Sequence, residues 1–535
     1  MRRTFIVIFL AFLFLALRIE HSTLFYELGR DKRYQMTAAA NLVAGKGISH
    51  CKTFPDDIAK VSCEELTWWS AGYPVVIAGL YKLTDDLITS DFILIVFGLV
   101  LFLFASFRFF SLWFENPFEN WSFGAFLLFA GLSFTPFNYF STNDLVSTSF
   151  LLVVLSEASI GFRDRRNAAF VIAGSAAFAA AFFKFSFYPF LAVVPAALFL
   201  LSILRRELAP TRYIIYFLLP ISIGFLALLA FFPNHVTPPS GEWTQGWNWY
   251  NLGSQDPFAA KALFFIDFLL RRLDPGTTYG LTLLGLIQAF SILLVGSAAC
   301  IAGRYVYLNL DSEREGGRTL SALIGIITVA TVVVYLMWLS VRVATFYHPI
   351  YQAWTFVQET RYYGPAMVLI LFTLFIFPNF IRTERRMLRL ASIGLVLAMT
   401  LYAVAYWGFK NFDYFYNGRI EGSFEGGHRD DAEVAEFLKN DRSLDRGSTV
   451  LGFVSHAGAY RYPILLVKAD PQRYPFPWYD WYVGSTAVNT SQPRTLLVMI
   501  HKSPTVPDLD LLQQYRNTRI LQLSTYDLYR VEITP

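Results

Sequence analysis

The chain has 535 residues, of which 55% are hydrophobic and 16% are charged. A soluble domain cannot bury so large an apolar share, and an aromatic content of 18% adds to the surface that lipid or neighbouring helices must cover. The formal net charge of +4 is modest, so nothing in the composition points to a nucleic-acid partner.

Apolar runs of about 20 residues, the length that crosses a bilayer as a helix, recur along the chain. About eleven such runs predict a multi-span α-helical membrane protein. They cover 5–20, 88–113, 121–140, 144–161, 168–183, 186–204, 212–232, 279–306, 319–340, 361–380 and 387–408. The first follows an N-terminal Met-Arg-Arg without a small-residue cleavage site, which favours an uncleaved anchor that starts in the cytoplasm. The run at 71–83 contains Pro74 and is too short to cross, which favours a juxtamembrane helix.

Arginine clusters in alternate loops set the predicted orientation. With this set of spans, most cytoplasmic loops are rich in arginine, as the positive-inside rule requires. Counting 71–83 as a further span would place the same clusters outside. The loops at 20–87, 234–277 and 341–360, together with the C-terminal tail, are then external.

The tail has the mixed pattern of a small folded domain. Its helical periodicity lies at 431–440 and 509–517, and its strand-like runs lie at 448–454, 494–500 and 519–533, the last with a turn at Ser524–Thr525. We therefore predict two domains. The first is a transmembrane domain at 1–408 with external loops at 20–87 and 234–277, and the second is an extracytoplasmic α/β domain at 409–535.

The stretch GRDKRYQMTAAANLVAGKGISH, residues 29–50, places an acid just outside the first span. It predicts a short helix from Arg33 to Ala44 that ends at Gly45 and Gly47, with Asp31 at its head. One interpretation of Asp31 is an N-cap that accepts hydrogen bonds from free backbone N–H groups. The other is a functional acid at the membrane surface.

A second acid, Asp144, lies in a similar position at the start of the span at 144–161. It too could serve as a cap, with Thr142 and Asn143 as competitors. Both acids are predicted on the external side, at the ends of different spans. This shared location favours a functional role for Asp31 and Asp144.

Two cations are predicted on the same surface. Lys184 is alone in a long apolar stretch, where a lysine is costly unless it serves a function, and a snorkelling turn residue is the structural alternative. Arg361 lies at the external end of the span at 361–380, where its guanidinium suits phosphate, and an interfacial arginine is the alternative. Acids that take a proton and cations that hold a phosphate fit transfer from a lipid-phosphate donor to a hydroxyl or amine.

Five segments, in order, resemble the GT-C superfamily of polyprenyl-phosphate-sugar glycosyltransferases. They are GRDKRYQMTAAANLVAGKGIS, WWSAGYPVVIAGLYKLTDD, YFSTNDLVSTSF, FFKFSFYPFLAVVPA and ETRYYGPAMVLILF, and they lie within residues 29–372. The most similar branch is the bacterial one that contains the lipid A aminoarabinose transferases and the protein mannosyltransferase-like enzymes. Each motif alone is short, and the ordered set carries the resemblance.

The resemblance implies an inverting transfer from a polyprenyl-phosphate-linked sugar to a lipid, glycan or protein acceptor. It also implies a bacterial inner-membrane protein whose active site and tail face the periplasm. Asp31 and Asp144 match the two loop acids of the family, and Lys184 and Arg361 match positions thought to hold the lipid phosphate. There are departures, because Lys32 stands where many relatives have a second acid, and the metal-binding Asp-x-Asp of oligosaccharyltransferases is absent, with Asn143-Asp144 instead. No cofactor is expected, and a divalent metal stays open.

Other residues of the external loops are candidates for further roles. Cys51 and Cys63 share the first loop, where an oxidising environment favours a disulfide over two free thiols. Candidate contacts to donor or acceptor are Tyr34, Glu64, Glu65, His348 and Tyr362. The alternatives to a transferase are a lipid or sugar transporter or flippase, which often shows repeated halves, and a polysaccharide polymerase or ligase. We find no internal repeat in the sequence.

Overall fold

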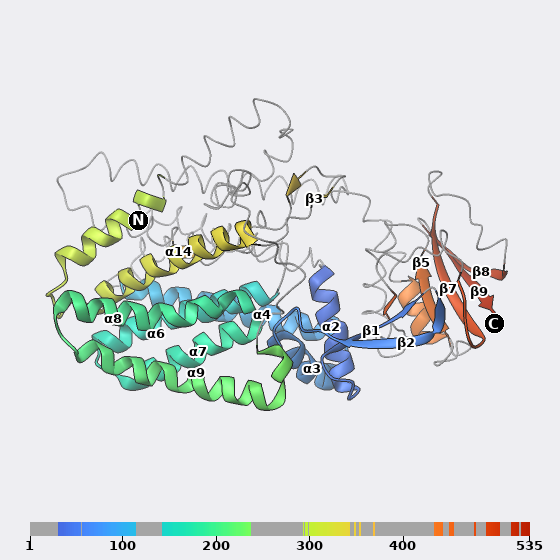
Figure 1. Cartoon of the computed structure of the whole chain (residues 1–535), viewed down its shortest axis with the longest axis horizontal. Coiled ribbons are helices and arrows are strands. Elements are labelled where there is room, and N and C mark those ends of the chain that lie inside the picture. Colours follow the sequence, from blue (N-terminus) through green and yellow to red (C-terminus); the bar gives the residue numbers. More distant parts are fainter. Residues whose placement is uncertain are drawn as a thin grey trace, which may run out of the picture. The chain divides into compact units, whose positions relative to one another are not determined.

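Figure 1 shows the computed structural model of the whole chain. The structure describes residues 30–54, 56–113, 142–236, 293, 295–297, 299–342, 347–348, 353–354, 368–369, 433–441, 449–453, 476–477, 488–502, 515–523 and 526–535. The chain forms two compact units. Unit 1 consists of Met1–Tyr26 and Ile95–Phe409, and unit 2 consists of Glu27–Leu94 and Lys410–Pro535. The segment Glu27–Leu94 thus folds with the tail, whereas the sequence predicts that the loop at 20–87 belongs to the transmembrane domain.

Unit 1 is a bundle of apolar helices. In the described part of the chain, five helical stretches are long and apolar enough to cross a membrane, and they are Leu87–Ser111, Thr142–Arg163, Phe185–Arg205, Ala209–Phe231 and Gly316–Tyr335. They coincide with predicted runs, as does the shorter apolar helix α7 (Asn167–Phe183). The protein is therefore an α-helical integral membrane protein. The predicted runs at 5–20, 121–140 and 387–408 lie outside the described residues, and those at 279–306 and 361–380 lie largely outside them.

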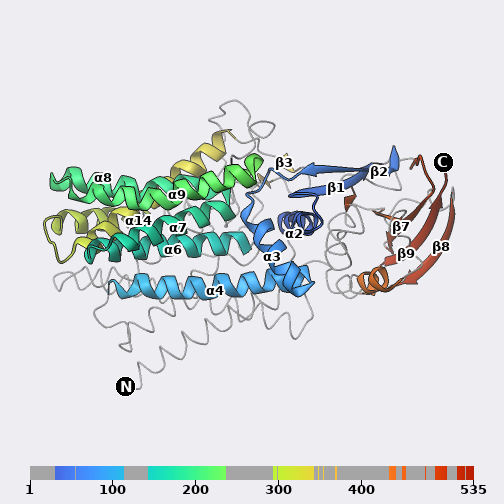
Figure 2. The same ribbon diagram turned by 90° about the horizontal axis from the view of Figure 1, so that it is seen from below.

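The helices of unit 1 run side by side (Figure 2). They are α4 (Leu87–Ser111), α6 (Thr142–Arg163), α7, α8 (Val193–Arg205), α9 (Arg212–Phe231) and α14 (Gly316–Arg342). In α6, 83% of the apolar window is buried, whereas in α9 only 17% is buried, so α6 is enclosed by protein and α9 presents most of its surface to lipid. Asp144 is thus carried on the most enclosed of these helices.

Small residues bring α7 close to its neighbours. A Cβ atom on Gly174 of α7 would lie 2.0 Å from the backbone oxygen of Phe217 in α9, so only glycine fits at this crossing. Ala173, Ala177 and Ala180 are buried along the same helix. Close backbone approach through small residues is how helices associate in membranes, where lipid gives no hydrophobic drive between them.

The helical path breaks after α7. Lys184 has an extended backbone, with φ −155° and ψ 122°, and a 3₁₀ turn, η2 (Phe185–Ala192), precedes α8. Pro189 lies inside this turn and has no N–H to donate to an α-helical ladder. The predicted span at 186–204 therefore begins as a 3₁₀ turn and becomes an α-helix only at Val193.

The first segment of unit 2 contains α2 (Arg30–Val43), β1 (Ser49–Phe54), β2 (Asp57–Glu65) and α3 (Gly72–Thr84). Helix α3 matches the juxtamembrane helix predicted at 71–83. Helix α2 ends before Gly45 and Gly47, as predicted, and both glycines have positive φ angles of 76° and 73°. However, α2 begins at Arg30 rather than at Arg33, so Asp31 lies in its first turn. The reason is that Arg30, Lys32 and Arg33 are good helix formers.

The second segment of unit 2 holds a four-stranded sheet with the order β5-β7-β9-β8. Its strands are β5 (Thr449–Phe453), β7 (Arg494–His501), β8 (Arg516–Gln522) and β9 (Tyr526–Ile533), and a helix covers residues 433–440. Strands β5 and β7 are parallel, and the other neighbours are antiparallel. The strands coincide with the predicted runs, except that Arg516 and Asn517 belong to β8 and not to the helix predicted at 509–517. Tyr515 forms a bend before β8, and residues 509–514 lie outside the described residues.

The two segments of unit 2 share hydrogen bonds and a core. Strand β1 pairs with β6 (Phe476–Pro477) in parallel. The backbone N–H of Ile58 donates to Asn489 O at 3.0 Å, and the backbone N–H of Ser491 donates to Asp57 Oδ1 at 2.9 Å. The side chain of Ile58 is fully buried in a cluster with Val450 and Leu496 of the sheet. The first loop is thus an integral part of the fold that the tail makes.

Candidate functional site

An ion pair joins two of the predicted site residues in unit 1. Asp144 is the third residue of α6, and only 2% of its side chain is exposed. Lys184 follows the last residue of α7, and 17% of its side chain is exposed. The ammonium of Lys184 donates a hydrogen bond to Asp144 Oδ1. The two groups, 40 positions apart in the sequence, therefore meet at one end of the helical bundle.

Both helix ends stabilise the charges they carry. The first turn of an α-helix has unpaired N–H groups and a partial positive charge, which favours the carboxylate of Asp144. The last turn carries a partial negative charge, which favours the ammonium of Lys184 just beyond α7. Because an isolated charge at this depth is costly, the pair and the two helix ends together explain how Asp144 and Lys184 are tolerated in an apolar bundle.

The start of α6 is unusually polar for a buried membrane helix. Thr142, Asn143, Ser147 and Thr148 are all buried there. Ser147 Oγ donates to the backbone oxygen of Ala180 at 3.0 Å, which links α6 to α7 next to the ion pair. Thr148 Oγ1 is buried without a hydrogen-bond partner. A polar patch of this kind is expensive in an apolar environment unless it serves a ligand or a neighbouring helix.

A second buried ion pair lies in unit 2, and the sequence analysis missed it. Lys32 Nζ lies 2.9 Å from Asp91 Oδ2, with side-chain exposures of 7% and 0%. The hydroxyl of Tyr73 donates to Asp91 Oδ1 at 2.7 Å. These three side chains tie together α2, α3 and the start of α4. Two features of the sequence could have indicated this pair. Asp91 is a single acid within the apolar run at 88–113, and Lys32 stands where many members of the resembled family have a second acid.

The Lys32–Asp91 pair fixes the rotation of α2 about its axis. Asp31 precedes Lys32 in the first turn of this helix. The side chain of Asp31 itself lies outside the described residues. Asp31 belongs to unit 2, whereas Asp144 and Lys184 belong to unit 1. The prediction that Asp31 and Asp144 face one cavity therefore stays a prediction.

Other predicted site residues fall at the edge of the described chain or beyond it. His348 lies in the short strand β3 (Tyr347–His348), which pairs with β4 (Ala353–Trp354), and its side chain is outside the described part. Arg361 and Tyr362 lie wholly outside the described residues. The role of Arg361 at the donor phosphate, and the contacts of His348 and Tyr362 to donor or acceptor, therefore stay predictions from the sequence.

The predicted acids and tyrosine of the first loop lie around the β1–β2 hairpin. Glu64 pairs with Lys52 across the two strands at 2.7 Å, and Glu65 is the exposed last residue of β2. Tyr34 of α2 stacks on Trp69, with ring centroids 6.1 Å apart, and meets His50 edge-on at 5.6 Å. Burial, followed by the nearby Lys52 charge, lowers the pKa of His50 from its ordinary value of 6.5.

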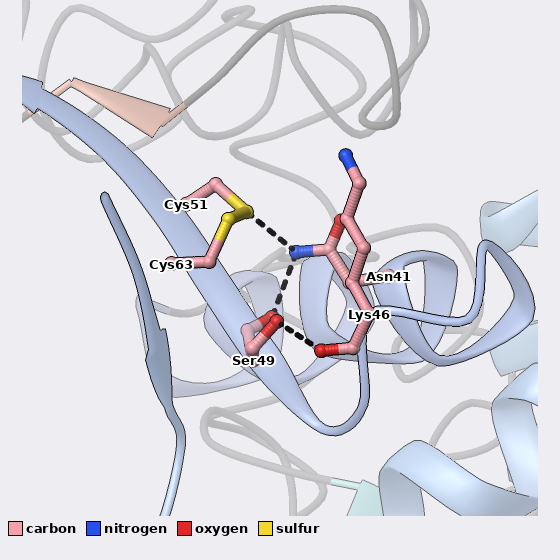
Figure 3. The surroundings of a disulfide bond; sticks show 5 residues. All are labelled: Asn41, Lys46, Ser49, Cys51 and Cys63. Carbon is pink, nitrogen blue, oxygen red and sulfur yellow. Dashed lines mark hydrogen bonds between the residues drawn. A yellow bond between two sulfur atoms is a disulfide. The ribbon is translucent and has the colours of Figure 1, made fainter. Parts of the chain in front are cut away.

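A disulfide joins Cys51 and Cys63, which face each other across the hairpin (Figure 3). The side-chain amide of Asn41, near the end of α2, donates to Ser49 O at 2.8 Å and to Cys51 Sγ at 3.7 Å. These bonds fasten the helix that carries Asp31 to a cross-linked hairpin. Among the residues that the structure describes, no group of three or more His, Cys, Asp or Glu side chains is placed to hold a metal ion.

The helices and the buried pair define the class of protein, a helical membrane protein with charged groups at one end of its bundle. No family model matches the chain, and no curated protein sequence matches it. Among solved structures, the chain is similar to ArnT from Cupriavidus metallidurans bound to undecaprenyl phosphate and to the same protein in the apo state. Both alignments cover 97% of this chain and 97% of the other at 12% identity, with TM-scores of 0.40 and 0.39.

Proposed function

We propose that this chain is a membrane glycosyltransferase. It moves a sugar from a polyprenyl-phosphate-linked donor to a lipid, glycan or protein acceptor at the outer face of a bacterial inner membrane, with inversion at the anomeric carbon. The observation that carries the proposal is the buried Asp144–Lys184 pair at the end of the helical bundle. The ordered sequence segments that contain these residues support the same conclusion.

Lys184 has the features of a phosphate-binding group. Its side chain is 17% exposed and lies directly beyond the end of an apolar helix. Asp144 supplies a counter-charge while no donor is bound, and it holds the lysine in place. A phosphate that reaches Lys184 makes a charge-assisted hydrogen bond, which is stronger than a bond between neutral groups.

The chemistry divides among the predicted residues. The acceptor hydroxyl or amine attacks the anomeric carbon, the bond from that carbon to the phosphate oxygen breaks, and the electron pair leaves with the polyprenyl phosphate. Lys184, together with Arg361, stabilises the charge that grows on the leaving phosphate. Asp31 accepts the proton of the acceptor as the new bond forms. A single displacement of this kind inverts the anomeric centre.

The test is donor binding by the intact protein in lipid nanodiscs, with undecaprenyl phosphate as the probe. Lys184→Met should weaken binding about tenfold or more, because it removes a charged hydrogen bond. Lys82→Met is the matched control, since Lys82 is an exposed lysine of α3. Asp144→Asn should retain binding, because the ammonium stays. Equal affinity in the Lys184 and Lys82 variants would show that Lys184 is only an anchor.

The same buried pair also suits a lipid or sugar transporter, since charged groups inside membrane bundles often mark transport paths. Detergent micelles separate the two functions, because they offer no second compartment. A transferase in micelles converts a polyprenyl-linked sugar and an acceptor into a glycosylated product, whereas a transporter leaves both unchanged. A single added sugar, rather than a growing chain, distinguishes the transferase from a polymerase.

A further inference from the structure

Four aromatic rings gather on one surface of unit 2. We call this group the aromatic shelf, and it consists of Tyr34 from α2, His50 from β1, and Trp68 and Trp69 from the turn between β2 and α3. Trp68 and Trp69 stack at 6.4 Å with an interplanar angle of 30°, and Trp69 and Tyr34 stack at 6.1 Å with an angle of 18°. The rings thus form a continuous, nearly parallel series that ends at the edge of His50.

The aromatic shelf is open on one side and fixed on the other. Trp68 is 49% exposed, while Leu66 and Tyr73, which flank the turn, are buried. The disulfide holds β1 to β2, and the Asn41 hydrogen bonds hold β1 against α2, so the elements that supply His50 and Tyr34 are fastened together. A ligand that lies on these rings therefore binds a surface that is already ordered, which reduces the entropic cost of binding.

Acids and a polar nitrogen border the rings. The carboxylate of Glu64 is oriented by Lys52 at 2.7 Å and its side chain is 51% exposed. Glu65 is exposed beside it, and His50 Nδ1 is buried without a hydrogen-bond partner. The exposed carboxylate of Glu64, opposite His50 in the β1–β2 ladder, does not suit an anionic lipid surface, which attracts lysine and arginine. The exposed indole of Trp68 ends the stack, and a ring of this kind suits a polar ring molecule that has one apolar face.

We propose that the aromatic shelf binds a pyranose ring of the acceptor. A pyranose has a face of C–H groups, which carry a partial positive charge and are attracted to the negative face of an aromatic ring. Its hydroxyl groups point outward from that face and can donate to an exposed carboxylate such as that of Glu64. The assignment of this sugar to the acceptor rests on the proposed function. The binding of a sugar by the aromatic shelf does not depend on that function.

The experiment uses the intact protein in nanodiscs and two probes, maltohexaose and chitohexaose. Saturation-transfer NMR should show contact between protein rings and the C–H protons of at least one sugar. Trp68→Ala should weaken that sugar's affinity about two- to tenfold, the range expected for one aromatic stacking partner, and Trp68→Phe should recover part of it. Trp338→Ala is the matched control, because Trp338 is 43% exposed and stacks on Tyr335, but lies in α14 of unit 1.

Three outcomes would overturn the assignment. The first is the absence of an NMR saturation-transfer signal from the protein to either sugar, and the second is an equal effect of Trp68→Ala and Trp338→Ala on sugar affinity. The third is strong quenching of Trp68 fluorescence by brominated lipids, which would identify a membrane anchor. Undecaprenyl phosphate binding is measured on the same samples. If wild-type protein binds sugar but not this lipid, the aromatic shelf stands and the proposed transfer reaction falls.

Discussion

Asp144 shows at the scale of one residue what a buried acid requires of its surroundings. It is 2% exposed and ion-paired with Lys184, so its removal leaves an ammonium without its partner among apolar helices. We expect Asp144→Asn to lower the free energy of unfolding by up to about 3 kcal/mol. This is the lower end of the range for breaking a buried ion pair, because Lys184 is partly exposed. Denaturant titration in detergent micelles measures the change.

The control is the double variant Asp144→Leu with Lys184→Met, which removes both charges and keeps similar volume. It should recover a large part of the lost stability, because apolar replacement of a whole buried pair is often neutral. A double variant as unstable as Asp144→Asn would show that the helix ends, and not the pairing, set the energetics at this position.

Asp31 is the residue on which the proposed chemistry depends most. It lies in the first turn of α2, where the helix dipole favours its ionised form. Asp31→Asn keeps the shape and the hydrogen-bonding oxygen but cannot accept a proton, so we expect a folded protein that binds undecaprenyl phosphate and transfers sugar about 10² to 10⁴ times more slowly. A product-forming assay alongside a melting curve measures both effects. Full activity in a folded Asp31→Asn protein would remove Asp31 from the role of base.

Single residues also mark where sequence reasoning stopped. Lys184 and Asp144 were each predicted as unusual, but their contact spans 40 positions and depends on how α6 and α7 pack, which no local pattern encodes. Asp91 was hidden because one acid does not interrupt a strongly apolar run. Its partner Lys32 was read only as a departure from a motif, although it is the residue that ties α2 to α4.

At the scale of elements, the apolar runs predicted most of what is described in unit 1. Length and hydrophobicity are local properties, so α4, α6, α9 and α14 fall where they were expected. Local rules predicted less well where backbone details decide the outcome. Pro189 turns the start of one predicted span into the 3₁₀ turn η2, and Arg516 extends β8 through the ladder it forms with β9 rather than by its own propensity.

The β1–β2 hairpin should make unit 2 sensitive to acid. Burial lowers the pKa of His50 below 6.5 in the folded protein, so the unfolded chain binds more protons than the folded one between these two values. The stability contributed by neutral His50 is complete above pH 6.5 and is lost as the pH falls through the folded pKa. We expect the difference in melting temperature between the wild type and His50→Gln to shrink as the pH falls from 7.5 to 5.

His50→Gln serves as the reference because it keeps a polar side chain and does not titrate. Measuring wild type and variant at each pH cancels the contributions of all other ionisable groups. A difference that is constant from pH 7.5 to pH 5 would show that His50 binds protons equally well in both states.

At the scale of the whole molecule, the arginine-rich loops predict that unit 2 lies outside the cytoplasm. The prediction is tested by single cysteines in a Cys300→Ser background, since Cys300 is an exposed free thiol. Lys46→Cys, in the exposed turn after α2, should react with a membrane-impermeant maleimide in intact cells. Glu207→Cys, in the loop after α8, should react only after lysis. The reverse labelling pattern would invert the topology.

The construction of unit 2 from two distant chain segments has a consequence for biosynthesis. The disulfide-linked hairpin needs only neighbouring residues and can form as soon as it leaves the membrane. Its partners Phe476 and Asn489 emerge after every helix of unit 1 has been inserted, which at about 5–20 residues per second takes on the order of tens of seconds. During that interval the edge of β1 and the apolar Ile58 lack the partners that cover them in the folded protein. A damaging change in the last strands of the chain would therefore disorder the loop that carries Asp31, although hundreds of residues separate them.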